Sequence, residues 1–277
     1  MRQRVVSALV GLGVLALVML LLDTLFLNVI LVAISMIALF EMLTATGCMQ
    51  FKGLSLLAFI PSVVLPFYHI PFVESIWPLV VGGHFLLFFV ILIRGFPKIR
   101  VEQASMIFLF SLLLPLCFSC GVLLRDNNGA AAGGLYILLA LGSAWLCDSG
   151  AFFVGSRFGK TKLAPVISPK KTVEGAIGGV IATVIFMALV AWGYQALWAS
   201  LGTVIVVNYP AMLLLTPLFA IMGMLGDLSA SVIKRQFNVK DFGNLMPGHG
   251  GILDRFDSTL FTLPAVYLFS HYITIVR

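Results

Sequence analysis

The sequence is poor in charged residues. Only 10% of its 277 residues are charged, 61% are hydrophobic, and the mean hydropathy is +1.10. Since an ordinary soluble domain carries about 25% charged residues, this composition excludes that class. The net charge of +6 could suit nucleic acid, but no soluble basic domain is present to carry such binding. We therefore predict no nucleic-acid partner, and expect the cations to attract anionic lipid headgroups and phosphorylated ligands.

Cysteine is scarce as well, with 4 residues in the chain. Cys117 and Cys120 have the spacing of a redox or zinc pair, but they lie in an apolar segment without a second pair or nearby histidines. We expect them to pack, and we assume neither disulfides nor structural zinc. Internal repeats, low-complexity tracts and soluble linkers are not evident either. One polytopic membrane domain over 1–277 is therefore the simplest organisation.

Long apolar runs recur along the whole chain. They are rich in Leu, Val, Ile and Phe, and each can cross about 30 Å of hydrocarbon as a helix that satisfies its own backbone. A transmembrane barrel would show short alternating segments instead. We predict an all-α integral membrane protein, a polytopic helical bundle with about nine transmembrane helices. The spans are 5–22, 25–46, 54–71 (broken by Pro61 and Pro66), 76–94, 104–124, 134–155, 173–198, 210–233 and 256–276.

The distribution of Lys and Arg predicts the orientation, because cytoplasmic loops retain these residues. With nine spans, nearly all basic residues fall on one side, and only Arg125 and Arg277 fall on the other. We expect a multi-pass protein of the cell inner (plasma) membrane, with the amino terminus and two polar loops, 156–172 and 234–256, in the cytoplasm. Arg2 and Arg4 before an apolar run also suit a signal peptide, but no small-residue cleavage site follows, so a retained helix is predicted.

Ionisable residues enter the spans of the carboxyl half. Asp148 lies within 134–155 and Asp227 within 210–233. A carboxylate at such depth costs a few kcal/mol unless it is paired, hydrated or metal-bound, which predicts a functional site. The alternative for Asp227 is a structural hydrogen bond between helices. Asp227, Ser231 and Lys234 share one helix face that leads into the second polar loop.

The segment 231–257 holds most of the reactive groups. Carboxylates can hold a metal, cations can hold phosphate, and glycines let backbone approach a ligand. The segment therefore predicts a phosphate-handling site at a membrane surface. Its members are the cations Lys234, Arg235, Lys240 and Arg255, the carboxylates Asp241, Asp254 and Asp257, the lone His249, and the glycines Gly248, Gly250 and Gly251.

The first polar loop contains a near miss for a nucleotide-binding loop. Gly155, Gly159, Lys160 and Thr161 have one residue too few between the glycines, and a membrane helix precedes them where a strand is required, so we reject a P-loop fold. The loop still offers cations for a polyphosphate, the alternative being a basic loop that only enforces topology. Ser168 before Pro169 can fix a turn or cap the next helix, where Glu174 suits the helix dipole. The cations are Arg157, Lys160, Lys162, Lys170 and Lys171.

Taken together, these residues make the chain resemble the bacterial phosphatidate cytidylyltransferase family, also called CDP-diacylglycerol synthases. The resemblance covers roughly the carboxyl half, 134–277, while the amino half, 1–125, shares only its hydrophobic helices. Met246 stands where the family tends to carry Leu, Ile or Phe. The signature residues are Ser231, Lys234-Arg235, Lys240-Asp241, His249-Gly250-Gly251, Asp254-Arg255 and Asp257; upstream are Asp148, Gly155, Gly159, Ser168-Pro169-Lys170-Lys171-Thr172 and Glu174-Gly175.

The resemblance implies a reaction of CTP with phosphatidic acid that yields CDP-diacylglycerol and pyrophosphate in phospholipid biosynthesis. It further implies Mg²⁺ and a second cation such as K⁺. Membrane lipids are expected around the protein, and a homodimer is compatible with the sequence. His249 could orient a phosphate or cap the glycine turn. By resemblance we assign Lys234, Arg235, Lys240, Asp241, His249 and Arg255 to catalysis, Ser168, Lys170, Lys171, Thr172, Glu174 and Ser231 to substrate binding, and Asp227, Asp254, Asp257 and Asp148 to metal binding.

Two other classes are disfavoured. A transporter should show related halves with polar groups in both, but the amino half has only Glu41 within a span. A CDP-alcohol phosphotransferase would carry its own aspartate-rich signature, which is absent.

Overall fold

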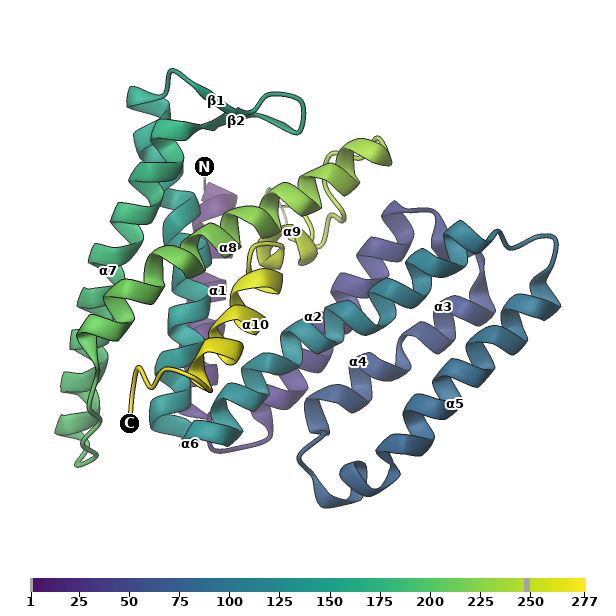
Figure 1. Cartoon of the computed structure of the whole chain (residues 1–277), viewed down its shortest axis with the longest axis horizontal. Helices are drawn as coiled ribbons and strands as arrows, with labels where there is room; N and C mark the ends of the chain where they lie inside the picture. The colour runs from purple at the N-terminus through teal and green to yellow at the C-terminus, as the bar shows by residue number, and fades with distance from the viewer. Residues whose placement is uncertain (1, 247–249) are drawn as a thin grey trace. The chain divides into compact units, whose positions relative to one another are not determined.

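The structure, a computed structural model, describes residues 2–246 and 250–277 and is almost entirely helical (Figure 1). This confirms the predicted helical class, to which it adds one short hairpin. The helices are α1 Arg2–Leu20, α2 Phe26–Ala45, α3 Lys52–Ala58, α4 Ile60–Val64, α5 Pro71–Gly95, α6 Val101–Phe158, α7 Val173–Ser200, α8 Tyr209–Gln236, α9 Leu253–Phe256 and α10 Thr259–Ser270, with 3₁₀ turns η1 Cys48–Gln50 and η2 Leu65–Phe67.

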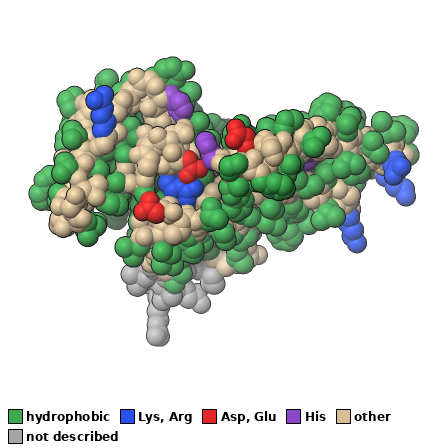
Figure 2. Space-filling view, turned by 90° about the horizontal axis from the view of Figure 1, so that it is seen from below, with side chains coloured by type: hydrophobic (Ala, Val, Ile, Leu, Met, Phe, Trp, Pro, Cys, Tyr) green, Lys and Arg blue, Asp and Glu red, His purple; other side chains and the backbone are tan. Residues whose placement is uncertain are grey.

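Within the described ranges, five helices are long and apolar enough to cross a membrane: α2, α5, α6, α7 and α8. Three further apolar helical segments are shorter, at Val10–Leu20, Lys52–Phe67 and Thr259–Ser270. Hydrophobic side chains cover most of the face seen in Figure 2, with only scattered charged groups. Such an apolar exterior is stable against lipid and not against water, which agrees with an integral membrane protein.

The predicted span 54–71 is broken, as expected from its prolines. Helix α3 ends at Ala58, α4 begins at Ile60, and η2 contains Pro66. Proline lacks the N–H that a continuous helix needs. Two buried hydrogen bonds tie this broken stretch to α2: Asn28 Nδ2 donates to Pro66 O at 2.5 Å, and Ser35 Oγ donates to Ser62 Oγ at 3.1 Å.

The predicted spans 104–124 and 134–155 both lie within α6. The helical pattern of α6 runs through the expected linker, but Gly129 has non-helical angles (φ 75°, ψ 165°), so two helices meet there at a kink. The chain folds back tightly around this point. A Cβ on Gly133 would lie 2.5 Å from Arg125 Cα, so that close approach requires glycine.

The chain divides into two compact units. The first comprises Met1–Val122 and Phe237–Arg255, and the second comprises Leu123–Gln236 and Phe256–Arg277. Most of the second polar loop therefore belongs with the amino half rather than with the rest of 134–277. The core of the first unit includes Leu39, Leu43 and Phe118, and that of the second includes Tyr136 and Phe219.

Small residues let α7 pack closely on the carboxyl end of α6 in the second unit. A Cβ on Gly179 would lie 2.6 Å from Cys147 O, and one on Gly175 would lie 2.8 Å from Ala151 O. Gly175 and Gly179 are one helical turn apart, the spacing by which membrane helices bring their backbones together. The contact places the start of α7 beside the end of α6, where the first polar loop begins.

That loop forms a two-stranded antiparallel hairpin, β1 Lys162–Ala164 with β2 Ser168–Thr172. Thr172 caps α7, since its Oγ1 accepts a hydrogen bond from Gly175 N at 3.2 Å. The cap is thus Thr172 and not Ser168, which lies in β2, because the capping residue must immediately precede the first helical turn. Glu174 accepts hydrogen bonds from Lys160 N (3.0 Å) and Thr161 N (3.1 Å), which ties the hairpin to α7.

Candidate active site

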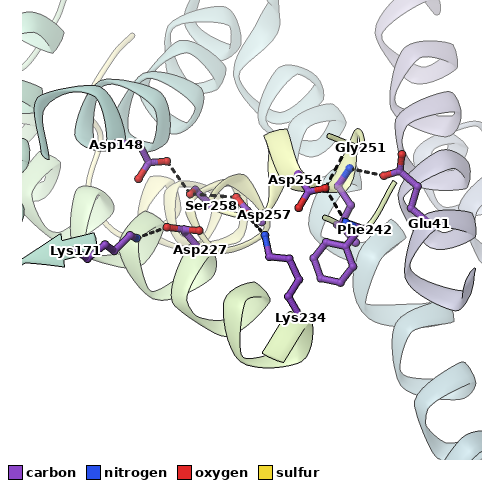
Figure 3. Close-up of polar contacts among 11 residues, drawn as sticks. Glu41, Asp148, Lys171, Asp227, Lys234, Phe242, Gly251, Asp254, Asp257 and Ser258 are labelled. Atoms are coloured by element: carbon purple, nitrogen blue, oxygen red, sulfur yellow. Dashed lines mark hydrogen bonds and ion pairs between the residues drawn. The ribbon is translucent and has the colours of Figure 1, made fainter. Parts of the chain in front are cut away.

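The second unit gathers charged side chains from the hairpin, α6, α8 and the residues just before α10 (Figure 3). Lys171 on β2 forms an ion pair with Asp227 on α8. Seven residues further along α8, the Nζ atom of Lys234 lies 3.8 Å from Oδ2 of Asp257, which precedes α10. Asp227 and Lys234 therefore lie on one face of α8, as predicted from their spacing. The hairpin, α8 and the start of α10 together build this cluster.

Ser258 links the two remaining carboxylates of the cluster. Its Oγ donates to Oδ2 of Asp148, on α6, at 3.2 Å, and its backbone N–H donates to Oδ1 of Asp257 at 2.7 Å. Asp257 is buried, with 6% of its surface exposed. The side chains of Asp227 and Asp148 repel a negative charge on Asp257, and the ammonium group of Lys234 attracts it. The cluster thus gathers three acidic side chains and two lysines.

A further contact sets the hairpin against α8. Arg235 Nε donates to Ile167 O, in the hairpin turn, at 3.2 Å. The sequence predicts that Arg235 grips phosphate, and in the fold one of its donors positions the loop that carries Lys170 and Lys171. Lys170 is exposed, while Lys171 is half-buried.

The first unit holds a separate polar cluster, built around the segment 241–254. Oδ2 of Asp254, on α9, accepts hydrogen bonds from Phe242 N at 2.8 Å and Gly251 N at 3.0 Å. Glu41, on α2, accepts from Ile252 N at 3.0 Å and from Leu253 N at 2.8 Å (Figure 3). Two buried carboxylates thus hold the backbone of this segment, 241–254, which we call the signature loop.

The glycines of this loop shape its turn. Gly250 has φ +82°, a conformation that side chains disfavour, and its carbonyl accepts from Met246 N at 2.9 Å. Gly251 and Gly243 both face the Glu41 carboxylate, which occupies the positions where their Cβ atoms would be. The loop therefore needs glycine at position 250 for the turn, and at positions 243 and 251 to make room for the Glu41 carboxylate.

The other predicted site residues are less enclosed. Lys240, Asp241 and Arg255 are exposed, and Ser231 is half-buried on the same stretch of α8 as the paired residues. His249 and Gly248 lie outside the described residues. The roles of these side chains in catalysis and substrate binding stay predictions.

The donor chemistry of the second-unit cluster suits a hard cation. Asp148, Asp227 and Asp257 offer carboxylate oxygens in excess over the nearby lysines. Over residues 2–246 and 250–277, no three His, Cys, Asp or Glu side chains come together as a ready metal site. Mg²⁺ is commonly held by one or two carboxylates, water and substrate phosphates, so the carboxylates fit it without a complete protein cage. Asp254 belongs to the first unit, where its Oδ2 already holds two N–H groups.

Two residues of these clusters have no role predicted from the sequence. Glu41 carries a usable signal, because a carboxylate within an apolar span is costly unless it has partners. Its partners are more than 200 residues away (Ile252 is 211 residues further on), so the sequence could not identify them. Ser258 is an ordinary residue type with no distinguishing pattern.

Comparison with known proteins finds a matching family and several relatives. The model of the cytidylyltransferase family matches residues 2–273. Phosphatidate cytidylyltransferase of Bacillus subtilis (strain 168) is 41% identical over 182 residues, 66% of this chain and 63% of the relative. The enzyme of that name from Staphylococcus haemolyticus is 47% identical over 129 residues (47% and 46%), and that from Thermotoga maritima is 41% identical over 144 residues (52% and 50%). The matched segments span less than two thirds of each relative.

Proposed function

The chain belongs to the cytidylyltransferase family, and on this premise we propose that it transfers the CMP moiety of CTP to phosphatidic acid. The products are CDP-diacylglycerol and pyrophosphate. The observation that carries the proposal is the cluster in which Lys171 and Lys234 stand against Asp227, Asp257 and Asp148, next to a basic hairpin. Relatives named phosphatidate cytidylyltransferase supply the substrate class.

The proposed reaction needs little covalent help from the protein. The lipid phosphate attacks the α-phosphorus of CTP, the bond to the β-phosphate oxygen breaks, and pyrophosphate leaves. A phosphate monoester is already a nucleophile near neutral pH, so no serine or cysteine nucleophile is required. The protein must bring two anions together and neutralise the leaving group, a task of positioning and electrostatics. We assign Lys171, Lys234 and Arg235 to that task.

We assign Mg²⁺ to the carboxylates of the second-unit cluster, with Asp227 as the principal ligand and Asp148 and Asp257 beside it. The metal would neutralise charge on the triphosphate and on departing pyrophosphate. Lys171 forms an ion pair with Asp227, and this pairing orients the carboxylate. Asp254 remains a proposed ligand as well, and K⁺ a proposed second cation.

The topology belongs to the proposal too. We propose nine crossings of the cell inner membrane, with the amino terminus, the β1–β2 hairpin and the signature loop in the cytoplasm. Support comes from the five helices long and apolar enough to cross a membrane, from the three shorter apolar helical segments, and from the one-sided distribution of Lys and Arg. Surrounding membrane lipids and a homodimer complete the proposed setting.

A nucleotide screen tests the reaction. Purified protein in lipid bilayers is given phosphatidate, Mg²⁺ and one nucleoside triphosphate at a time, and pyrophosphate release is followed. We expect release with CTP, or with its deoxy form, and none with ATP, GTP or UTP. Chelation of Mg²⁺ should stop the reaction, and CDP-diacylglycerol should form in equal amount to pyrophosphate. Equal rates with all nucleotides, or release without phosphatidate, would contradict the proposal.

A further inference from the structure

Glu41 is a buried acid on α2, a helix with no other charged residue. Only 5% of its surface is exposed, and α2 is one of the helices suited to cross a membrane. Each carboxylate oxygen accepts one backbone N–H: Oε1 from Ile252 at 3.0 Å and Oε2 from Leu253 at 2.8 Å (Figure 3). One side chain of the amino half thus holds two consecutive amides of the signature loop.

The loop is shaped to receive this carboxylate. Cβ atoms on Gly243 and on Gly251 would both collide with Glu41, whereas Gly82 on α5 has nothing within 4 Å. The two glycines come from opposite ends of the loop and meet the same side chain. Because two separate positions of the loop leave room for the same carboxylate, the position of Glu41 in the fold is specific.

The bonds of Glu41 continue those of Asp254. Gly251 N donates to Asp254, Ile252 N and Leu253 N donate to Glu41, and Phe242 N donates to Asp254. Three consecutive N–H groups are therefore held by two carboxylates. Asp254 and Arg255 follow within the next two positions, on the single turn of α9. If the hydrogen bonds to Glu41 lengthen or break, these two residues shift with the backbone that precedes them.

We infer that Glu41 is a positioning residue of the proposed transfer reaction: it clamps the turn Gly251–Leu253 and thereby orients Asp254 and Arg255. The inference rests on the proposed function for its catalytic part, while the clamp itself is a property of the fold. The replacement Glu41→Gln keeps the size of the side chain but sets an NH₂ group against one backbone donor. Glu102→Gln is the matched control, since Glu102 is an exposed acid of the same unit.

Hydrogen exchange tests the clamp without any need for activity. In detergent or lipid discs, the amides of Ile252 and Leu253 should exchange at least about tenfold faster in Glu41→Gln than in the wild type. Glu102→Gln should leave them unchanged. If Glu41→Gln does not fold, Glu41→Asp, which shortens the same carboxylate, should show the same local acceleration. Unchanged exchange at both amides in these variants would overturn the clamp.

A double-mutant cycle tests positioning. Gly251→Ala should lower kcat at least about tenfold because its methyl group collides with Glu41, yet it should cost little in the Glu41→Ala background, where that space is empty. Glu41→Gln should lower kcat with little change in KM for CTP, since the substrates still bind but the reacting groups are misplaced. Gly82→Ala should change neither value.

The outcomes separate the two ideas. Additive effects of Glu41→Ala and Gly251→Ala, or normal kcat in Glu41→Gln alongside faster exchange, would overturn the positioning role. A wild-type protein that is inactive with CTP and phosphatidate would overturn the proposed function and the catalytic part of this inference. In that case the exchange rates still decide whether Glu41 clamps the loop.

Discussion

At the scale of single residues, the basic hairpin contains cations with different surroundings. Lys170 is exposed, whereas its neighbour Lys171 is half-buried and paired with Asp227. A loop that only enforces membrane orientation needs positive charge and no particular geometry. The pairing of Lys171 is a geometric feature, and it favours a contact role for this lysine in the proposed reaction over a purely topogenic one.

Lys171→Gln should therefore reduce catalytic efficiency at least about tenfold. The variant loses a charge-assisted contact of about 1.5 to 3 kcal/mol and leaves Asp227 without its counter-charge. Steady-state kinetics with CTP and phosphatidate measure the effect, and Lys98→Gln, at an exposed lysine outside both polar loops, is the matched control with near-normal efficiency. Adding a lysine at Thr161 restores net charge without the geometry, so no rescue is expected. Full activity in Lys171→Gln, or recovery in the double variant, would show that only diffuse charge matters.

At the scale of elements, the cluster depends on how closely α6 and α7 pack. Glycines on α7 bring its backbone against α6, and Thr172 and Glu174 then fix the hairpin at the amino end of α7. On α8, Gly226 serves a similar purpose, since a Cβ there would lie 2.6 Å from Asp257 O. Small residues at helix contacts thus determine where the polar groups of β2, α8 and the start of α10 stand.

Gly179→Leu should destabilise the protein. Its side chain would meet Cys147 O, a backbone atom that cannot move aside, and overpacking of this kind costs about 1 to 3 kcal/mol. Thermal unfolding in detergent should show a lower midpoint. Gly193→Ala on the same helix has nothing within 4 Å of its Cβ position, so it should be neutral or slightly stabilising. Equal midpoints for Gly179→Leu and the wild type would refute the close α6–α7 contact.

At the scale of the whole molecule, the proposed topology places the hairpin and the signature loop on one side of the membrane. Cysteines introduced at Ser156 and Asn244, both exposed, should react with a membrane-impermeant reagent from the cytoplasmic side. A cysteine at Thr203, between α7 and α8, should react only from the other side. The native cysteines are buried and give little background. Labelling of Ser156→Cys or Asn244→Cys from the outer face would refute the nine-span arrangement.

Several residues of the site could be predicted from the sequence, because a charged residue within an apolar span is rare and therefore easy to recognise. The cost of a carboxylate in an apolar span predicts a function for Asp148 and Asp227, and both lie in the second-unit cluster. The same rule applies to Glu41, but its role depends on Ile252 and Leu253, which are far away in sequence. The cap of α7 lies four residues beyond Ser168, since Ser168 and Thr172 are both suitable residue types and only the backbone decides between them.

The sequence by itself determined the helical membrane class and the residue types of the site. Both follow from side-chain transfer energies, which sum along the chain whatever the packing. Only the tertiary structure decided which charges pair, that Asp254 and Glu41 hold the signature loop, and that this loop belongs with the amino half. Such contacts join residues distant in sequence, and their geometry depends on how closely the helix backbones approach, which a one-dimensional pattern does not encode.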